Sequence, residues 1–267
     1  MTSTANHESQ EQARTIAAHR GRSLLVLYWP DDGEVKEDDV RDLRKFLKAQ
    51  GLTRGTILPR LDVLIETIGG ESDPPYLIGQ MLHDYADKIS FLVPNKALSA
   101  GTEICLAGHQ VIMGEDATLS PIDTQFRDDE GRWWSETAIE HFRELADGAE
   151  GEDTRTAIIA STIGSIAPET IAKAYRESRV AAQHAEQLLN QHMLKDASPD
   201  QIKEVLDRLT KTAPSHECVN FRGDQAGIFT DISPLWKCGS LRHIRLLCAG
   251  QSPPWLLSRA RWRYQQS

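Results

Sequence analysis

The stretch VPNKALSAGTEICLAG at residues 93–108 is an apolar run interrupted by the small or hydroxylic residues Ser99 to Thr102. The residues that follow have the pattern of a helix and then another strand, so Ser99 is expected at a strand-to-helix junction. The first turn of a helix has unpaired N–H groups and a positive dipole end, which would stabilise a developing oxyanion. Ser99 is therefore either a nucleophile or an N-cap, a position that serine also favours.

Strands and helices alternate on both sides of this junction. Apolar runs bounded by turn residues predict strands at 23–30, 61–70, 88–94 and 110–114. Apolar positions at helical spacing predict helices at 10–21, 37–51, from 74 onward, at 100–108, 168–195 and 199–211. This alternation is typical of an α/β fold with a mainly parallel sheet and right-handed crossovers, followed here by a more helical C-terminal part. In such sheets, sites form at the carboxyl ends of the strands.

The predicted organisation is an N-terminal helical arm at 1–21, an α/β domain at 22–230 and a C-terminal extension at 231–267. The extension ends in PPWLLSRARWRYQQS, in which arginines alternate with aromatic residues. Basic and aromatic residues together suit stacking on nucleic-acid bases. Because the rest of the chain is acidic, we favour packing of this tail on its own subunit or on a neighbouring one.

Composition excludes several classes of function. The 267 residues carry a formal net charge of −9, which argues against a nucleic-acid or membrane-surface binder. The four cysteines form no CxxC pair, and no histidines have zinc-ligand spacing, so neither a disulfide framework nor a metal site is expected. No leader or membrane-spanning run is apparent, which predicts a cytoplasmic protein without a cofactor or a membrane partner.

A second junction lies at TIGGES, where Gly69 and Gly70 end the predicted strand at 61–70. If neighbouring parallel strands bring both junctions to one sheet edge, the N–H groups of Gly70 and Ala100 can point at one spot beside Ser99 Oγ. Amide hydrolysis needs a nucleophile, a base and donors for the oxyanion. The two junctions supply the nucleophile and the oxyanion donors, but not the base.

IETIGGES, LVPNKALSAGTEICLAGHQVIMG and LSPIDTQ, in this order and at these intervals, resemble the serine dehydrogenase proteinase family. This family is a branch of the Clp-protease and signal-peptide-peptidase-A superfamily, with a Clp/crotonase-like spiral of βαβ units. The resemblance runs from the N-terminal helix to residue 125 and reappears at KTAPSHECVNFRGDQAGIF, residues 211–229. It implies that Ser99 is the nucleophile of a serine endopeptidase. It also implies that Gly69, Gly70 and the Ala100 N–H form the oxyanion hole.

These motifs do not decide which residue is the general base for Ser99. In Clp peptidases a histidine follows the serine, and the equivalent position here falls at Asp123, which would orient or charge-stabilise a base rather than act as one. Signal-peptide-peptidase relatives use a desolvated lysine, for which Lys173 is the first downstream candidate. His216 in APSHE is favoured over Lys173 because histidine titrates near neutral pH, and His141 is a third candidate.

The resemblance also implies partners. Members of the superfamily assemble into homo-oligomers, as trimers, hexamers or larger rings, and act on peptides or unfolded proteins. Activation by a partner protein or a ligand would be compatible with such an enzyme. This chain has Glu71 where the family usually has aspartate after the glycine pair. Two rival hypotheses are a catalytically inactive oligomeric scaffold of the same fold and a crotonase-type acyl-thioester enzyme using the same oxyanion hole.

Overall fold

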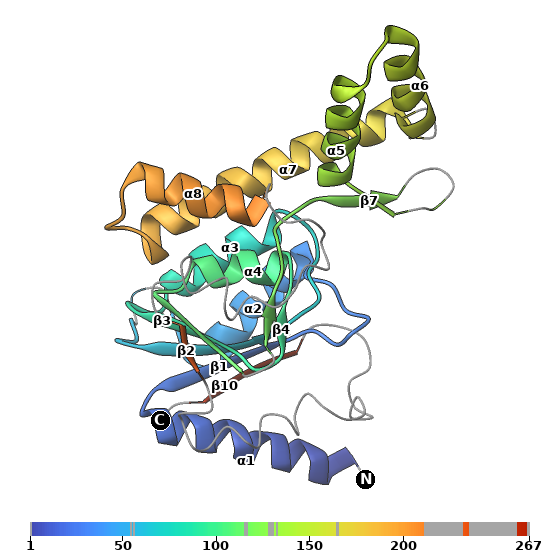
Figure 1. The fold of residues 1–267 in the computed structure, drawn as a ribbon. Coiled ribbons are helices and arrows are strands. Elements are labelled where there is room, and N and C mark those ends of the chain that lie inside the picture. The colour runs from blue at the N-terminus through green and yellow to red at the C-terminus, as the bar shows by residue number, and fades with distance from the viewer. Residues whose placement is uncertain are drawn as a thin grey trace.

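The structure, a computed structural model, describes residues 2–53, 55, 57–114, 117–127, 131, 133–163, 166–210, 232–234 and 261–265. Its centre is a six-stranded sheet in the order β10-β1-β2-β3-β5-β9 (Figure 1). The strands are β1 (Ser23–Tyr28), β2 (Leu61–Glu66), β3 (Ile89–Val93), β5 (Gln110–Met113), β9 (Ile232–Pro234) and β10 (Arg261–Gln265). All pairs are parallel except β1 with β10. The predicted α/β fold with a mainly parallel sheet is confirmed.

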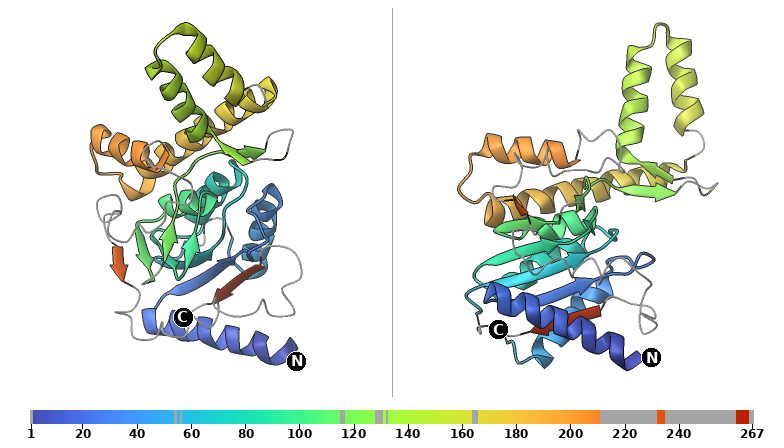
Figure 2. Two further views of the ribbon diagram at one scale, coloured as in Figure 1. Left: turned by 45° about the vertical axis from the view of Figure 1, so that its right-hand side comes forward. Right: turned by 60° about the horizontal axis from the view of Figure 1, so that its bottom comes forward.

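Both faces of the sheet are covered, which explains why its strands read as continuous apolar runs. Helices α2 (Glu37–Ala49), α3 (Pro74–His83) and α4 (Ala100–Leu106) lie on one face, and α1 (Thr2–Arg20) lies on the other (Figure 2). Alternate residues of β2 serve the two layers, because Val63 packs with the three helices and Leu64 packs with Ile16 of α1.

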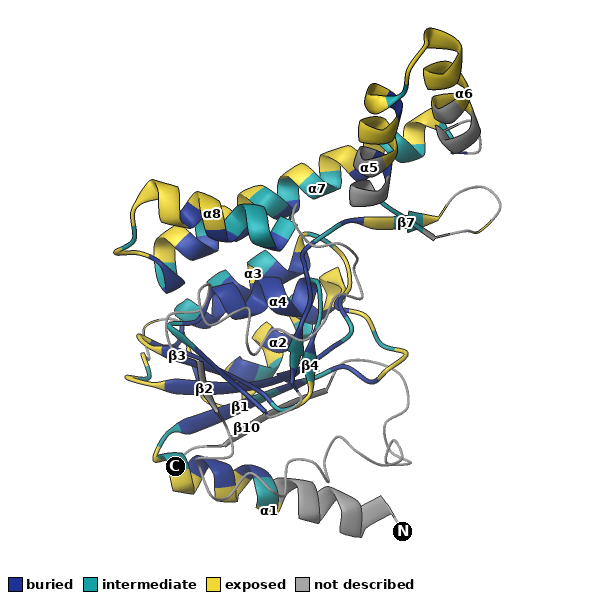
Figure 3. Ribbon diagram, viewed as in Figure 1, coloured by how far each residue is buried: buried dark blue, intermediate teal, exposed yellow. Residues whose placement is uncertain are grey.

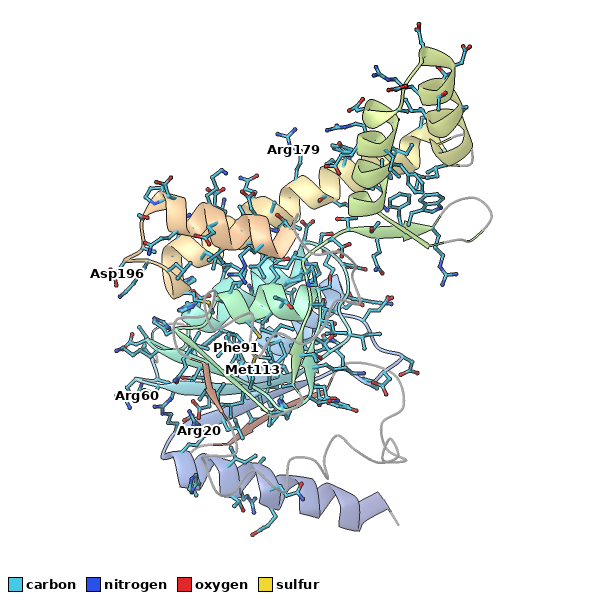
Figure 4. The ribbon with its side chains drawn as sticks, viewed as in Figure 1. Arg20, Arg60, Phe91, Met113, Arg179 and Asp196 are labelled. Carbon is cyan, nitrogen blue, oxygen red and sulfur yellow. The ribbon has the colours of Figure 1, made fainter. Side chains whose placement is uncertain are left out.

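An ion cluster joins α1 to the sheet. The guanidinium groups of Arg20 and Arg22 both contact the carboxylate of Asp62 in β2, which is 1% exposed. Figure 4 shows Arg20 at this end of α1, and shows Phe91 and Met113 inside the core. The N-terminal helix is therefore fixed to the sheet by charge as well as by apolar packing.

Two small sheets flank the site. Strand β4 (Lys96–Ala97), just before α4, pairs in parallel with β6 (Thr118–Leu119), which follows β5. Strand β7 (Gln125–Arg127) pairs antiparallel with β8 (Trp133–Ser135) and leads into the helical part of the chain.

The second half is helical up to residue 210, as predicted. It contains α5 (Glu136–Gly148), α6 (Glu152–Ile163), α7 (Pro168–Leu188), a π-helical turn η1 (Leu189–Met193) and α8 (Pro199–Thr210). Helix α7 crosses over α3 and α4, while α5 and α6 form a hairpin that projects from the body (Figure 1). Figure 3 shows that this hairpin is largely exposed. The acidic segment DGAEGED at 147–153 lies across the short connection between α5 and α6.

The segment predicted as a C-terminal extension supplies both edge strands of the central sheet. Residues 261–265 pair with β1, and residues 232–234 pair with β5. This part of the chain therefore shares the sheet of the main body. The predicted histidine motif at 211–229, including His216, lies outside the described residues.

Candidate active site

Ser99 occupies a sharp turn between β4 and α4. Its φ of 47° and ψ of −108° make it the only non-glycine residue with positive φ in the described parts of the chain. Its N–H donates to Ser120 Oγ at 2.7 Å. Its own side chain makes no capping bond to α4. Ser99 therefore does not act as a side-chain N-cap, and a costly backbone conformation held by its neighbours is a feature of functional sites.

The turn packs closely against the end of β2. Leu98 N–H donates to the Thr67 carbonyl at 3.1 Å. A Cβ atom added to Gly101 would overlap the Thr67 methyl group. The absence of a side chain at Gly101 therefore lets the start of α4 approach β2.

Gly69 and Gly70 lie against this turn. Gly69 has a φ of +117°, and a Cβ built on it would lie 3.2 Å from Ser99 Cβ. Gly70 forms a parallel bridge with Val35 whose hydrogen bonds are made by its neighbours: Val35 N–H donates to Gly69 O, and Glu71 N–H donates to Val35 O. The Gly70 N–H therefore faces away from Val35.

A groove of about 890 Å³ unites the predicted residues. Ser99, Ala100, Gly69 and Gly70 all line it, as the first turn of α4 and the end of β2 meet there. Asp123 lines the same groove from the segment after β6, and Lys173 lines it from α7. Six of the eight residues singled out from the sequence thus line one cavity. The other two are His216, which lies outside the described residues, and His141, whose side chain lies outside them as well.

The candidate bases differ in their surroundings. The Lys173 side chain is 66% exposed and lies 3.6 Å from Glu177 Oε1, so it lacks the apolar surroundings that a neutral lysine base requires. Asp123 is half-buried. His141 lies in α5, and its side chain is outside the described part of the structure.

A buried acidic residue that was not predicted from the sequence lies beside Ser99. Glu103, one helical turn after Ser99, is 1% exposed and lines the groove. Burial raises the pKa of its carboxyl well above the usual range, and the nearby charge of Asp73 raises it further. The signal was present in LSAGTE, because residues four apart share a helix face.

His184 of α7 approaches the same carboxyl. Its Nδ1 lies 3.8 Å from Glu103 Oε1, and neither atom has a hydrogen-bond partner in the described residues. Its ring stacks on Tyr76 with centroids 4.3 Å apart. Burial lowers the pKa of His184, while the charge of Asp73 opposes that shift. Helix α7 is thereby packed over the N-terminal turns of α3 and α4.

Within the described residues, no group of three or more metal-ligating side chains converges. Of the helices there, none combines the length and the apolar composition needed to cross a bilayer.

Comparison with solved structures finds a mutant of ClpP1 from Listeria monocytogenes, 14% identical, with a TM-score of 0.41, covering 85% of this chain and 98% of that one. It also finds a membrane-bound stomatin-specific protease named 1510-N, in a mutant bound to a substrate peptide. This match is 20% identical with a TM-score of 0.30, covering 51% of this chain and 64% of that one.

Two relatives come from Methanocaldococcus jannaschii, the uncharacterized proteins MJ1495 and MJ0137. Each is 31% identical, over 119 and 100 residues respectively. These alignments cover 44% and 38% of this chain, but only 39% and 33% of the relatives.

The family model of ClpP-like SDH-type serine proteinases matches residues 8–131. This segment contains β1 to β7 and both glycine and serine junctions. The match confirms the resemblance drawn from IETIGGES and ALSAGT. Residues 8–131 of the chain are therefore similar to the ClpP-like SDH-type serine proteinases.

Proposed function

We propose that the protein is a serine peptidase in which Ser99 attacks the carbonyl carbon of a peptide bond. The observation that carries the proposal is the contact between two junctions: Gly69 lies against Ser99, in a groove that both residues line. The strained turn presents Ser99 at the start of α4, as an activated nucleophile requires.

The oxyanion hole is assigned to two backbone donors. The Ala100 N–H belongs to the first residue of α4, where N–H groups have no partner within the helix. The Gly70 N–H faces away from its bridge to Val35, on the side left for the groove. Each such donor is typically worth about 100- to 1000-fold in rate.

The reaction follows from these positions. The base takes the Ser99 Oγ proton as Oγ bonds to the carbonyl carbon, and the carbonyl oxygen becomes an anion between the two N–H groups. Collapse of this intermediate breaks the C–N bond, and the base returns the proton to the leaving amine. Water then hydrolyses the acyl-enzyme by the same route. His216 or Lys173 is the proposed base, with Asp123 as the charged neighbour.

The substrate and assembly proposed for the enzyme follow its family. A peptide or an unfolded segment fits an open groove better than a folded protein does, because the scissile bond must reach the two N–H groups. Homo-oligomerisation, as a trimer, hexamer or larger ring, is proposed on the same basis, as is activation by a partner.

Intact-mass spectrometry after treatment with a fluorophosphonate tests the proposal. Wild type is expected to gain one adduct and Ser99→Ala none. Loss of the adduct in His216→Gln or in Lys173→Met identifies the base, with His141→Gln as a third comparison. A wild-type chain that stays unlabelled at neutral and alkaline pH contradicts an activated serine and favours the inactive scaffold.

A further inference from the structure

The groove around Ser99 is strongly acidic. Among the residues that line it, seven are acidic and two are basic: Glu34, Glu37, Glu71, Asp73, Glu103, Asp123 and Glu177 against Lys173 and Arg176. One of the two basic residues, Lys173, is already paired with Glu177. The cavity walls therefore create a negative potential where a substrate would lie.

Part of this charge has a structural explanation, and part has none. Glu71 Oε2 accepts the Glu37 N–H at 3.1 Å, at the start of α2, which is an ordinary cap for a helix N-terminus. Glu103 is different, because it is among the residues that line the groove and its buried Oε1 has no hydrogen-bond partner in the described residues, with His184 Nδ1 at 3.8 Å. An unpaired buried carboxyl costs stability, so such a group points to a partner that arrives with the ligand.

The rest of the lining suits the stem of a long basic side chain. Leu77, at 44% exposure, and Val180 give the groove apolar surface beside the carboxyls. Lysine and arginine have apolar stems that pack on such surface while their charged heads reach an acidic group. A negatively charged or purely apolar side chain would leave the Glu103 carboxyl unpaired.

We propose that the Ser99 groove binds peptides carrying an arginine or lysine side chain, with Glu103 as the specificity-determining residue. This inference rests on the proposed peptidase function. The guanidinium or ammonium group lies against Glu103, and Asp73 adds its charge at the groove mouth. His184 Nδ1 lies 3.8 Å from Glu103 Oε1, the same oxygen that has no hydrogen-bond partner in the described residues.

The test measures binding, so that it does not depend on turnover. The full-length Ser99→Ala variant is titrated into fluorescein-labelled Ala-Ala-Arg-Ala-Ala-Ala, and fluorescence anisotropy is followed. The same peptide with citrulline, norleucine or glutamate in place of arginine gives the comparison, citrulline being the neutral isostere of arginine. Arginine is expected to bind about 10- to 100-fold more tightly than citrulline, the value of a charge-assisted hydrogen bond in a buried site.

The variant Glu103→Gln, made on the Ser99→Ala background, is expected to reduce the arginine-to-citrulline ratio to about threefold or less. Burial raises the pKa of Glu103, which favours the neutral carboxyl, and glutamine matches the shape of that neutral form. Asp73→Asn, at the exposed start of α3, is expected to reduce the arginine-to-citrulline ratio as well, and this substitution does not alter the core. Glu186→Gln, exposed on α7 and outside the groove lining, is the matched control and leaves the ratio unchanged.

The outcomes separate the two proposals. Equal binding of the arginine and citrulline peptides, or no binding of either, overturns the groove assignment even if Ser99 reacts with a fluorophosphonate. An unlabelled wild-type chain that still prefers arginine overturns the peptidase assignment and leaves the basic-peptide site standing. An undiminished ratio in Glu103→Gln would show that Glu103 does not select the basic group.

Discussion

Ser99, in the turn before α4, packs directly against Gly69, which follows β2. A Cβ built on Gly69 would lie 3.2 Å from Ser99 Cβ. Both residues have positive φ, 47° at Ser99 and 117° at Gly69. The two turns are therefore mutually dependent, and a side chain on one displaces the other.

Gly69→Ala is expected to reduce fluorophosphonate labelling of Ser99 by more than tenfold. An alanine at φ +117° is strained, at a cost of about 1–3 kcal/mol, and its methyl group presses on Ser99. Labelling rate and urea unfolding measure the two effects. Gly55→Ala, also at positive φ but with open space around it, is the control. It should lose stability without losing reactivity, and equal losses of reactivity in both variants would contradict the contact.

Ser120→Ala is expected to slow labelling of Ser99 about tenfold, with a modest loss of stability. Ser120 Oγ accepts the Ser99 N–H at 2.7 Å, so its removal leaves a donor unpaired, at about 1–3 kcal/mol, and loosens the turn. Time courses of adduct formation check this. Ser120→Cys, which retains a weak acceptor, should recover part of the rate. An unchanged rate in Ser120→Ala would show that the turn is held without this bond.

Glu103→Gln is expected to stabilise the empty protein at neutral pH and to have little effect near pH 4. The pKa of Glu103 is raised in the folded state by burial. Below the unfolded value of about 4.5 the carboxyl is neutral in both states. As pH rises, only the unfolded chain releases its proton, so the native state of wild type loses stability. Thermal melts between pH 4 and 8 measure this difference, and parallel curves for wild type and variant would contradict it.

A histidine stack should make the fold sensitive to acid. His83 and His192 stack with centroids 3.6 Å apart, and His109 lies beside them. Burial and the two neighbouring rings lower the pKa of His192 from 6.5 to about 4. Burying the neutral His192 ring contributes to the stability of the fold in full above pH 6.5. This contribution is lost as the pH falls toward 4, because the unfolded chain takes up the proton first.

His192→Gln should therefore lose less stability than wild type between pH 7 and 5, by roughly 1–2 kcal/mol after allowance for screening of the partly exposed ring. Other charges near the stack are Lys88 and Lys195, which act on His109 in the same direction. Urea unfolding at the two pH values is the measurement. His19→Gln, exposed on α1, is the control and should track wild type.

Asp62→Ala is expected to cost about 3–5 kcal/mol, because it removes the buried carboxylate that the guanidinium groups of Arg20 and Arg22 both contact. Arg20 and Arg22 converge on this 1% exposed carboxylate at the end of α1. Chemical unfolding measures the loss. Asp42→Ala removes an exposed pair with Lys45 and should cost under about 1 kcal/mol. A similar cost for both variants would show that the Asp62 cluster adds nothing beyond a surface pair.

Local pattern was enough to predict much of this fold. The apolar runs before Gly69 and Ser99 indicated buried strands because parallel strands are covered on both faces, and the alternation with helices indicated the sheet type. Ser99, Gly69, Gly70 and Ala100 were identified from two short motifs, since glycine pairs and small residues at strand ends are needed wherever backbone must approach closely.

The sequence by itself determined the order of the main strands and helices up to residue 114, the two junctions and the family resemblance of residues 8–131, all of which depend on residues close together in the chain. Only the tertiary structure brought α7 over the groove, with Lys173 exposed there, and buried Glu103 in its lining with Oε1 lacking a hydrogen-bond partner among the described residues. It also put residues 261–265 beside β1. These pairings join segments far apart in sequence, and their free energy comes from burial and charge in three dimensions, which no local pattern encodes.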